Sequence, residues 1–290
     1  MRVSLPKIDN DYEGYDALAC FYSQTENLEL DRIEVDMSET DWLSADMCAA
    51  FGAILHRLNT RLNKVNLLNI RENVMDILSR NGFLSHYGGD LIPDEWQTTI
   101  SYRRFDVKDD HFFANYIEEE FIQRSELPTM THELLKKFRE SIFEIFSNAV
   151  LHSQTELGIF CCGQLFPNQN RLVFTIADLG IGICKNINLK KGWKLTPTEA
   201  INWAIQEGNT TKSSNLPGGL GLILLCDFID LNNGCLHIVS DAGYWERRCQ
   251  RIITEELSKP FPGTIVSLEI DTSDTNTYGL NSELKPDDIF

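Results

Sequence analysis

Apolar and polar residues follow one another with two different periods in the first hundred residues. Alternation across residues 31–37 (DRIEVDM) predicts a strand, and an amphipathic run over residues 44–63 predicts a helix. A short apolar run over residues 65–70 predicts a second strand, and the helical pattern over 72–80 stops at Asn81-Gly82, as helices often do. The order strand, helix, strand, helix is typical of a small α/β layer structure.

Turn signals at Gly88-Gly89 and Pro93 separate this half from the next. We place the boundary within residues 88–108 and expect two domains, residues 1–100 and 101–290. After it, residues 95–106 predict a strand, and Asp109-Asp110 can cap a helix that runs to about Arg124. From Thr272 the chain is polar and is expected to form an extension with little core.

A strongly helical pattern begins at Thr131 (THELLKKFRESIFEIFSNAVLHS). One face is apolar. The other carries polar residues every four positions, namely Glu140, Glu144, Asn148 and His152. Any amphipathic helix has a solvated face, so this stripe alone does not define a site.

The segment RLVFTIADLGIGI predicts a buried strand that ends in Asp178. Gly180 and Gly182 follow, so the chain can turn tightly and bring its backbone against a flat ligand. A carboxylate at the end of a buried strand needs a hydrogen-bond donor, and the exocyclic amine of adenine is one. Turns that contain Asp and Gly are common, and the DxGxG pattern is weak evidence by itself.

A glycine-rich segment, NTTKSSNLPGGLGLILLCDFI, leads directly into an apolar helix over residues 222–229. Gly218, Gly219 and Gly221 open this helix, and the unpaired N–H groups at its positive end are suited to phosphates. A tight helix–helix contact would use the same glycines.

The distribution of charge indicates which kinds of partner this chain is expected to bind. The 290 residues carry 43 acidic and 26 basic side chains, a formal net charge of -17, which disfavours nucleic acid and anionic membranes as partners. Residues 9–46 hold twelve acids and one base. In contrast, the only charged side chains between Leu179 and Thr198 are four lysines, namely Lys185, Lys190, Lys191 and Lys194. This segment is either a solvated loop or a region that attracts a polyanionic ligand.

The compartment and redox state follow from what the sequence lacks. We find no apolar run of membrane-spanning length and no apolar core of a signal peptide, so we expect a cytoplasmic protein without a membrane partner. The eight cysteines include no CxxC pair, and we expect neither disulfides nor structural zinc.

Taken in order, three boxes resemble those of the GHKL superfamily, the histidine-kinase-like ATPases with the Bergerat nucleotide-binding fold. The matching segments are EIFSN (Glu144 to Asn148), DLGIG (Asp178, Gly180 and Gly182) and GGLGL (Gly218, Gly219 and Gly221). The later segments NGCLHIVSDAGYWE and PGTIVSLEID resemble that domain's closing strands. The resemblance covers about residues 108–272 and implies an α/β sandwich in which helices cover a mixed sheet.

The resemblance also implies roles and cofactors. ATP and Mg²⁺ would be the ligands, with Asn148 as the magnesium ligand and Asp178 reading adenine. The glycines would present backbone amides to phosphates, and Thr211 and Lys212 would contact nucleotide from a mobile lid that also holds Thr210. Glu144 would be the catalytic base, since it lies on the same helical face as Asn148 and four residues before it.

The first half resembles the STAS domains of bacterial partner-switching regulators in pattern, through IEVDMSETDWLSADMCAAFGAIL and RENVMDILSRNGFL. Members regulated by phosphorylation carry a serine at the start of the first helix. Our alignment puts Asp46 there, with Ser44 two residues earlier. The alternative is a docking domain without a phosphosite.

Three functions remain open. The first is Mg²⁺-dependent ATP hydrolysis coupled to lid closure and to regulation of a protein partner. The second is a serine protein kinase of the anti-sigma-factor kind, and the third is a nucleotide-gated binding module with little turnover. A sensor histidine kinase is disfavoured because the sequence has no membrane span and His132 lies too close to Asn148 to be a phosphoacceptor on a separate hairpin. Many relatives dimerise on ATP binding, but the sequence locates no interface.

Overall fold

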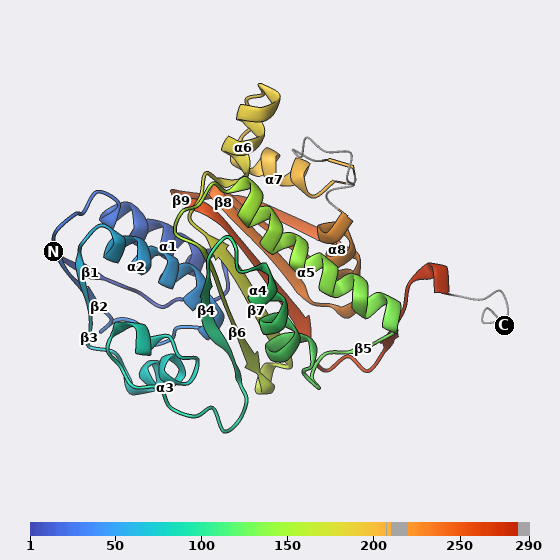
Figure 1. Cartoon of the computed structure of the whole chain (residues 1–290), viewed down its shortest axis with the longest axis horizontal. Helices are drawn as coiled ribbons and strands as arrows, with labels where there is room; N and C mark the ends of the chain where they lie inside the picture. The colour runs from blue at the N-terminus through green and yellow to red at the C-terminus, as the bar shows by residue number, and fades with distance from the viewer. Residues whose placement is uncertain (207, 210–219, 284–290) are drawn as a thin grey trace.

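The computed structural model describes residues 1–206, 208–209 and 220–283 of the chain, and shows a mixed α/β protein. Its helices are α1 (Tyr12–Thr25), α2 (Cys48–Thr60), α3 (Glu72–Arg80), α4 (Asp110–Ile117), α5 (His132–His152), α6 (Gly182–Lys191), α7 (Pro197–Ala204) and α8 (Leu220–Asn232) (Figure 1). Its strands are β1 (Arg2–Ser4), β2 (Arg32–Asp36), β3 (Lys64–Leu68), β4 (Thr99–Phe105), β5 (Thr129–Met130), β6 (Ile159–Phe166), β7 (Arg171–Asp178), β8 (Cys235–Arg248), β9 (Arg251–Asp271) and β10 (Thr277–Tyr278). No helix in the described part of the chain is both long enough and apolar enough to cross a membrane.

The first half forms a small parallel sheet in the order β1-β2-β3. The predicted alternation of strands and helices is confirmed here, and α3 has the predicted bounds. The short turn η1 (Ala45–Met47) leads into α2. Helix α1 was not predicted, although Tyr15, Leu18 and Phe21 are buried at helical spacing; Asp11 caps it by accepting a hydrogen bond from the Gly14 N–H at 2.9 Å.

The second half is built on a five-stranded sheet in the order β4-β6-β7-β9-β8. Each neighbouring pair in it is antiparallel, so the expected mixed sheet is wrong for this layer. The central strand β7 is paired on both sides and covered on both faces, which is why its sequence is apolar without alternation. The expected strand at residues 95–106 is β4, which starts at Thr99 and joins this sheet.

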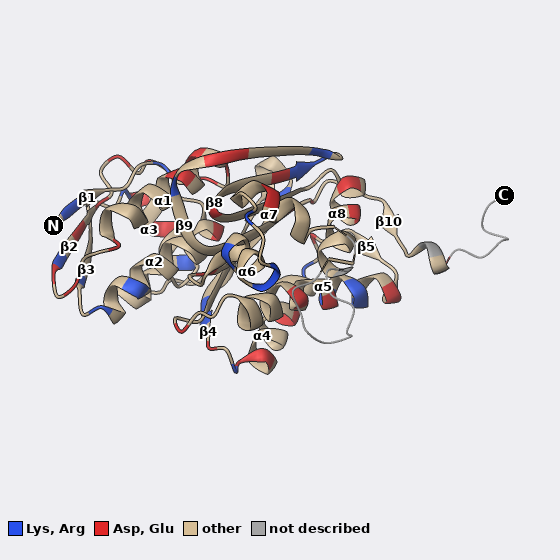
Figure 2. Ribbon diagram, turned by 90° about the horizontal axis from the view of Figure 1, so that it is seen from above, with Lys and Arg blue, Asp and Glu red and all other residues tan. Residues whose placement is uncertain are grey.

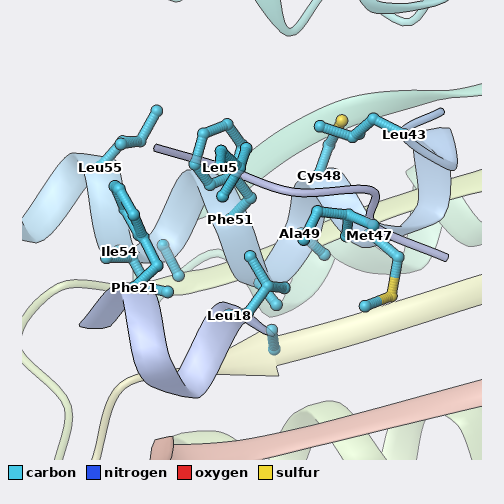
Figure 3. Packing of buried hydrophobic residues seen from close by; sticks show 14 of the residues in the cluster. Leu5, Leu18, Phe21, Leu43, Met47, Cys48, Ala49, Phe51, Ile54 and Leu55 are labelled. Atoms are coloured by element: carbon cyan, nitrogen blue, oxygen red, sulfur yellow. The ribbon is translucent and has the colours of Figure 1, made fainter. Parts of the chain in front are cut away.

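Helices from the two halves of the sequence cover opposite faces of that sheet (Figure 1). Phe160 and Ala177 belong to the core formed with α1 and α2, whereas Ile159 and Ile176 belong to the core formed with α5 and α8. Successive side chains of a strand point to opposite faces, so one sheet serves both cores. Figure 3 shows the first core, where Phe21 of α1 meets α2. The N-terminal half thus forms one layer of the molecule.

Strands β8 and β9 extend beyond the sheet as a hairpin arm, residues 241–261. Register shifts on either side of Asp241 bend the arm away from the sheet. The arm packs beside α1, where the Tyr12 hydroxyl donates to the Glu256 carbonyl at 2.8 Å and the Ser258 N–H donates to the Asp16 carboxylate at 2.6 Å.

The end of the described chain contributes to the fold more than its polar sequence predicts. Strand β10 pairs in parallel with β5, and the buried ring of Tyr278 packs edge-on against Phe228 of α8 with centroids 5.3 Å apart. Within the expected extension, Tyr278 is therefore a core residue, whereas Thr277 beside it is exposed.

Candidate functional site

A pocket lies on the α5 face of the sheet, bounded by α5, α6 and α7 and floored by β7, β8 and β9. Asn148, Asp178 and Gly182, which the sequence separates by up to 34 positions, all line it. Much of the rest of the lining is apolar: Ile145, Ala149, Ile176, Ile183, Ile187, Trp203, Leu222, Ile238 and Val266. An apolar pocket with a few convergent polar groups is the usual form of a small-molecule site.

Asp178 stands at the end of β7 and is 3% exposed. Its Oδ1 accepts a hydrogen bond from the Gly180 N–H at 2.8 Å. Burial raises the pKa of Asp178 to about 7, although the backbone N–H of Gly180 and the Ser153 hydroxyl favour the ionised form. The carboxyl group can therefore change its protonation state near neutral pH.

Close backbone contacts surround Asp178. Gly182 has a φ of +74°, and Gly263 has a φ of +93° in the left-handed region that glycine favours. A Cβ on Gly180 would lie 2.1 Å from the Ser153 carbonyl oxygen, and one on Gly263 would lie 2.1 Å from the Asp178 carbonyl oxygen. The glycines allow the turn after β7 to pack directly against α5 and β9.

The polar stripe of α5 reaches the pocket with Asn148 and His152, while its apolar face is buried as predicted. Glu144, one turn before Asn148, does not line the pocket. Its Oε2 accepts a hydrogen bond from the N–H of Gly221, in the first turn of α8, at 2.9 Å. A Cβ on Gly221 would lie 2.6 Å from the same oxygen, so a larger residue here would displace the Glu144 carboxylate from this contact. The predicted catalytic residue thus holds an amide that was expected to bind phosphates.

The lysine-rich segment is largely helical rather than a loop. Lys185, Lys190 and Lys191 lie on α6, which forms one wall of the pocket and shows as blue turns in Figure 2. Lys190 Nζ lies 3.3 Å from Nδ1 of His152 on α5. These cations bring positive charge to the pocket rim of a strongly acidic chain.

Several predicted ligands lie outside the described residues: Thr210, Thr211, Lys212, Gly218 and Gly219. Gly180 is described but is not among the lining residues. The sequence reasoning missed Trp203, Asn186 and Thr264, which do line the pocket. Only for Thr264 was there a signal, the quoted PGT segment, and it lies opposite Asp178 in the β7–β9 register.

The proposed phosphosite position is not accessible. Ser44 and Asp46 are both 0% exposed, since η1 packs against β6 and β7. The Ser44 hydroxyl donates to Asp9 Oδ1 at 2.8 Å. A kinase could not reach either side chain without separating this segment from the sheet.

The oxygen donors available suit a hard cation. The Asn148 amide lines the pocket, and the Glu144 carboxylate lies one helical turn away. Mg²⁺ takes few protein ligands and completes its octahedron with water and phosphate oxygens, so this set fits magnesium held together with a nucleotide.

Comparison with known proteins identifies no family for this chain, so a functional proposal has to rest on the geometry of the site. No protein-family model matches this chain, and no curated protein sequence matches it significantly.

Proposed function

We propose that the chain binds ATP with Mg²⁺ in the pocket between α5 and the sheet and hydrolyses it. The observation that carries the proposal is the convergence of Asn148, Asp178 and Gly182 on one largely apolar pocket. These residues come from two of the three boxes that resemble the GHKL superfamily, and on that reading the second half is a Bergerat-type ATP-binding layer.

The chemistry divides between the two ends of the pocket. At the β7 end, the buried Asp178 carboxylate accepts a hydrogen bond from the adenine amine, and the apolar lining packs against the base. At the α5 end, the Asn148 amide oxygen would be a ligand of magnesium, and the lysines of α6 would attract the phosphates. Magnesium supplies neutralisation of phosphate charge when it is bound.

Glu144 is the proposed general base, and its contact with Gly221 suggests how it is controlled. While Oε2 accepts the Gly221 N–H, that carboxylate is engaged with the start of α8. For hydrolysis, Glu144 must release the Gly221 N–H and accept a hydrogen bond from the attacking water instead. The released N–H would then donate to a phosphate oxygen. In the proposal, this exchange couples nucleotide state to the regulation of a protein partner.

A nucleotide-gated module with little turnover is the second candidate, favoured by that same Glu144–Gly221 hydrogen bond. A serine kinase acting on a partner remains the third, in line with a STAS-like first half in a cytoplasmic partner-switching system. The buried position of Ser44 disfavours phosphorylation of this chain by itself.

Phosphate release from ATP and Mg²⁺ by the purified full chain tests the enzyme proposal. We expect Glu144→Gln to lower kcat by about 100-fold or more with nucleotide affinity retained, in the range for losing a general base. Glu140→Gln, one turn earlier and exposed, is the matched control and should keep full activity. Binding without release by the unaltered protein would favour the gated module, and label transfer to a partner would favour the kinase. Unchanged ATP affinity in Asp178→Ala would refute the adenine assignment.

A further inference from the structure

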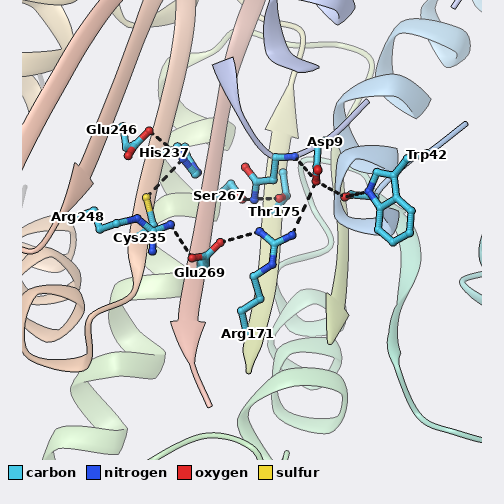
Figure 4. Close-up of polar contacts among 12 residues, drawn as sticks. Asp9, Trp42, Arg171, Thr175, Cys235, His237, Glu246, Arg248, Ser267 and Glu269 are labelled. Carbon is cyan, nitrogen blue, oxygen red and sulfur yellow. Dashed lines mark hydrogen bonds and ion pairs between the residues drawn. The ribbon is translucent and has the colours of Figure 1, made fainter. Parts of the chain in front are cut away.

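A second cluster of reactive side chains lies on the opposite face of the sheet from the pocket. Cys235 and His237 stand at alternate positions of β8, and Glu246 comes back toward them from the hairpin arm (Figure 4). His237 Nε2 lies 3.4 Å from Cys235 Sγ and 3.5 Å from Glu246 Oε2. One donor atom of each residue lies within 4.8 Å of the other two, so the three donors face a common point.

The cluster is shielded and held in place by aromatic residues. Cys235 is 0% and His237 3% exposed, while the Glu246 side chain is 21% exposed. The imidazole packs against the rings of Tyr15 and Tyr244, with centroids 5.8 Å and 5.9 Å away. The Tyr244 hydroxyl also donates to Glu246 Oε2 at 2.5 Å, which orients that carboxylate.

The separations of His237 Nε2 from Cys235 Sγ and from Glu246 Oε2 match those between ligands of one small cation. With Zn–S of about 2.3 Å and Zn–N of about 2.0 Å, tetrahedral angles put the sulfur and the nitrogen about 3.5 Å apart. A thiolate, an imidazole and a carboxylate are the ligand types of zinc, whereas Mg²⁺ and Ca²⁺ prefer oxygen alone.

The charges around the cluster also fit a divalent cation. One thiolate and one carboxylate neutralise it, and the nearby Arg248 guanidinium is already paired with Glu269 at 2.7 Å (Figure 4). Zinc binds the Cys235 thiolate and the neutral His237 imidazole, so the thiol proton and the extra proton of a charged imidazole are both released to solvent. The exposed side of Glu246 leaves a fourth position for a water ligand.

We propose that Cys235, His237 and Glu246 form a zinc site that fastens the hairpin arm to the body of β8. The site lies on the α1 face, so it is separate from the proposed magnesium position and does not depend on nucleotide binding. The proposal differs from the expectation, drawn from CxxC spacing, that the chain holds no structural zinc.

Zinc titration of the full chain, purified without a polyhistidine tag and stripped with a chelator, tests the proposal in the absence of nucleotide. We expect one Zn²⁺ per chain by elemental analysis and a higher melting temperature with zinc bound. Co²⁺ in the same site should show a thiolate-to-cobalt charge-transfer band and the intense visible bands of four-coordinate cobalt.

Glu246→Gln is the most informative variant, because glutamine keeps the size of this partly exposed side chain and an acceptor for Tyr244. We expect at least ~10-fold weaker zinc binding, since even outer-shell changes cost that much. Cys235→Ser should abolish the charge-transfer band. Cys226→Ser, a buried cysteine on α8 in the other core, is the matched control and should bind zinc as the unaltered chain does.

Two results would overturn the site. One is that the unaltered chain does not bind one Zn²⁺ per chain. Hydrogen bonding through His237 would then be the whole connection between the Cys235 thiol and the Glu246 carboxylate. The other is equal zinc affinity in Glu246→Gln and the unaltered chain, which would place the metal elsewhere.

Discussion

Two aspartates keep their carboxyl groups away from solvent, and they differ in what surrounds them. Asp178 accepts a backbone N–H and faces a pocket, whereas neither oxygen of Asp46 has a hydrogen-bond partner among the described residues. Burial raises the pKa of each to about 7. Asp178 can therefore form a hydrogen bond with a ligand in the pocket, while the Asp46 side chain is enclosed between η1 and the sheet.

Asp46→Asn should stabilise the protein above neutral pH. The folded-state pKa of Asp46 lies above its unfolded value, so the stability linked to this group is fully present below pH 4 and is lost as pH rises through about 7. An uncharged amide costs less to bury without a partner than a carboxylate, and we expect a gain of roughly 2 kcal/mol at pH 8. Urea unfolding from pH 4 to 8 measures this.

The exposed Asp41→Asn is the control for that experiment and should leave the pH profile unchanged. A difference between Asp46→Asn and the unaltered chain that does not vary with pH would contradict the argument.

Adenosine affinity should depend on pH through Asp178. The proposed hydrogen bond from the adenine amine requires the ionised carboxylate, so the dissociation constant should rise by up to tenfold per unit as pH falls below about 7. Calorimetry with adenosine avoids ionisation of the nucleotide phosphates. Asp178→Asn should bind more weakly at pH 8 and lose the pH dependence; a variant that keeps it would assign the titration to another group.

At the scale of elements, the turn from β7 into α6 is fixed by how closely β9 approaches it. A Cβ on Gly263 would lie 2.1 Å from the Asp178 carbonyl oxygen, and one on Gly182, which opens α6, would lie 2.9 Å from the Ser240 hydroxyl of β8. Three strands and a helix therefore meet around one turn, and the proposed base-binding end of the pocket depends on their fit.

A pair of glycine variants separates backbone strain from this close approach. Gly263 and Gly192 both have positive φ, +93° and +70°, but a Cβ on Gly192 would meet nothing within 4 Å. Gly192→Ala should cost about 1 kcal/mol, from strain alone. Gly263→Ala should cost at least 2 kcal/mol more and weaken nucleotide binding. Chemical denaturation of both variants measures the difference in unfolding free energy. Equal losses of stability would mean that β9 can shift at little cost to make room for the Cβ.

At the scale of the whole molecule, the five-stranded sheet joins the two halves of the sequence. The side chains of Phe160, Ala177 and Ile265 would be exposed to solvent without α1 and α2, and burial of such apolar area is the main stabilising term of folding. The halves should therefore unfold together.

Cleavage of the chain tests this prediction. A protease site inserted within residues 88–91, an exposed segment, should yield two pieces that remain associated in size-exclusion chromatography and melt in one transition. Phe51→Ala removes a buried ring from the shared core at a cost of about 3–5 kcal/mol and should let the pieces separate, whereas Leu62→Ala, at a side chain 71% exposed, should not. Two pieces that separate and stay folded would show independent domains.

Local pattern determined much of this protein without tertiary information. Helical periodicity located α3, and a continuous apolar run located the buried strand that ends at Asp178, because both patterns are carried by neighbouring residues. The sequence also singled out Asn148, Asp178 and Gly182, which the structure brings to one pocket.

What tertiary structure alone decided involves partners distant in the sequence. The antiparallel pairing of the large sheet, the pairing of β10 with β5, and the approach of Glu246 to His237 all depend on chain reversals that no local period encodes. The same holds for the engagement of Glu144 by Gly221 and for the burial of Asp46. A residue's own neighbours set its preferred backbone conformation, but its hydrogen-bond partner and its exposure to water are set by whichever distant segment packs against it.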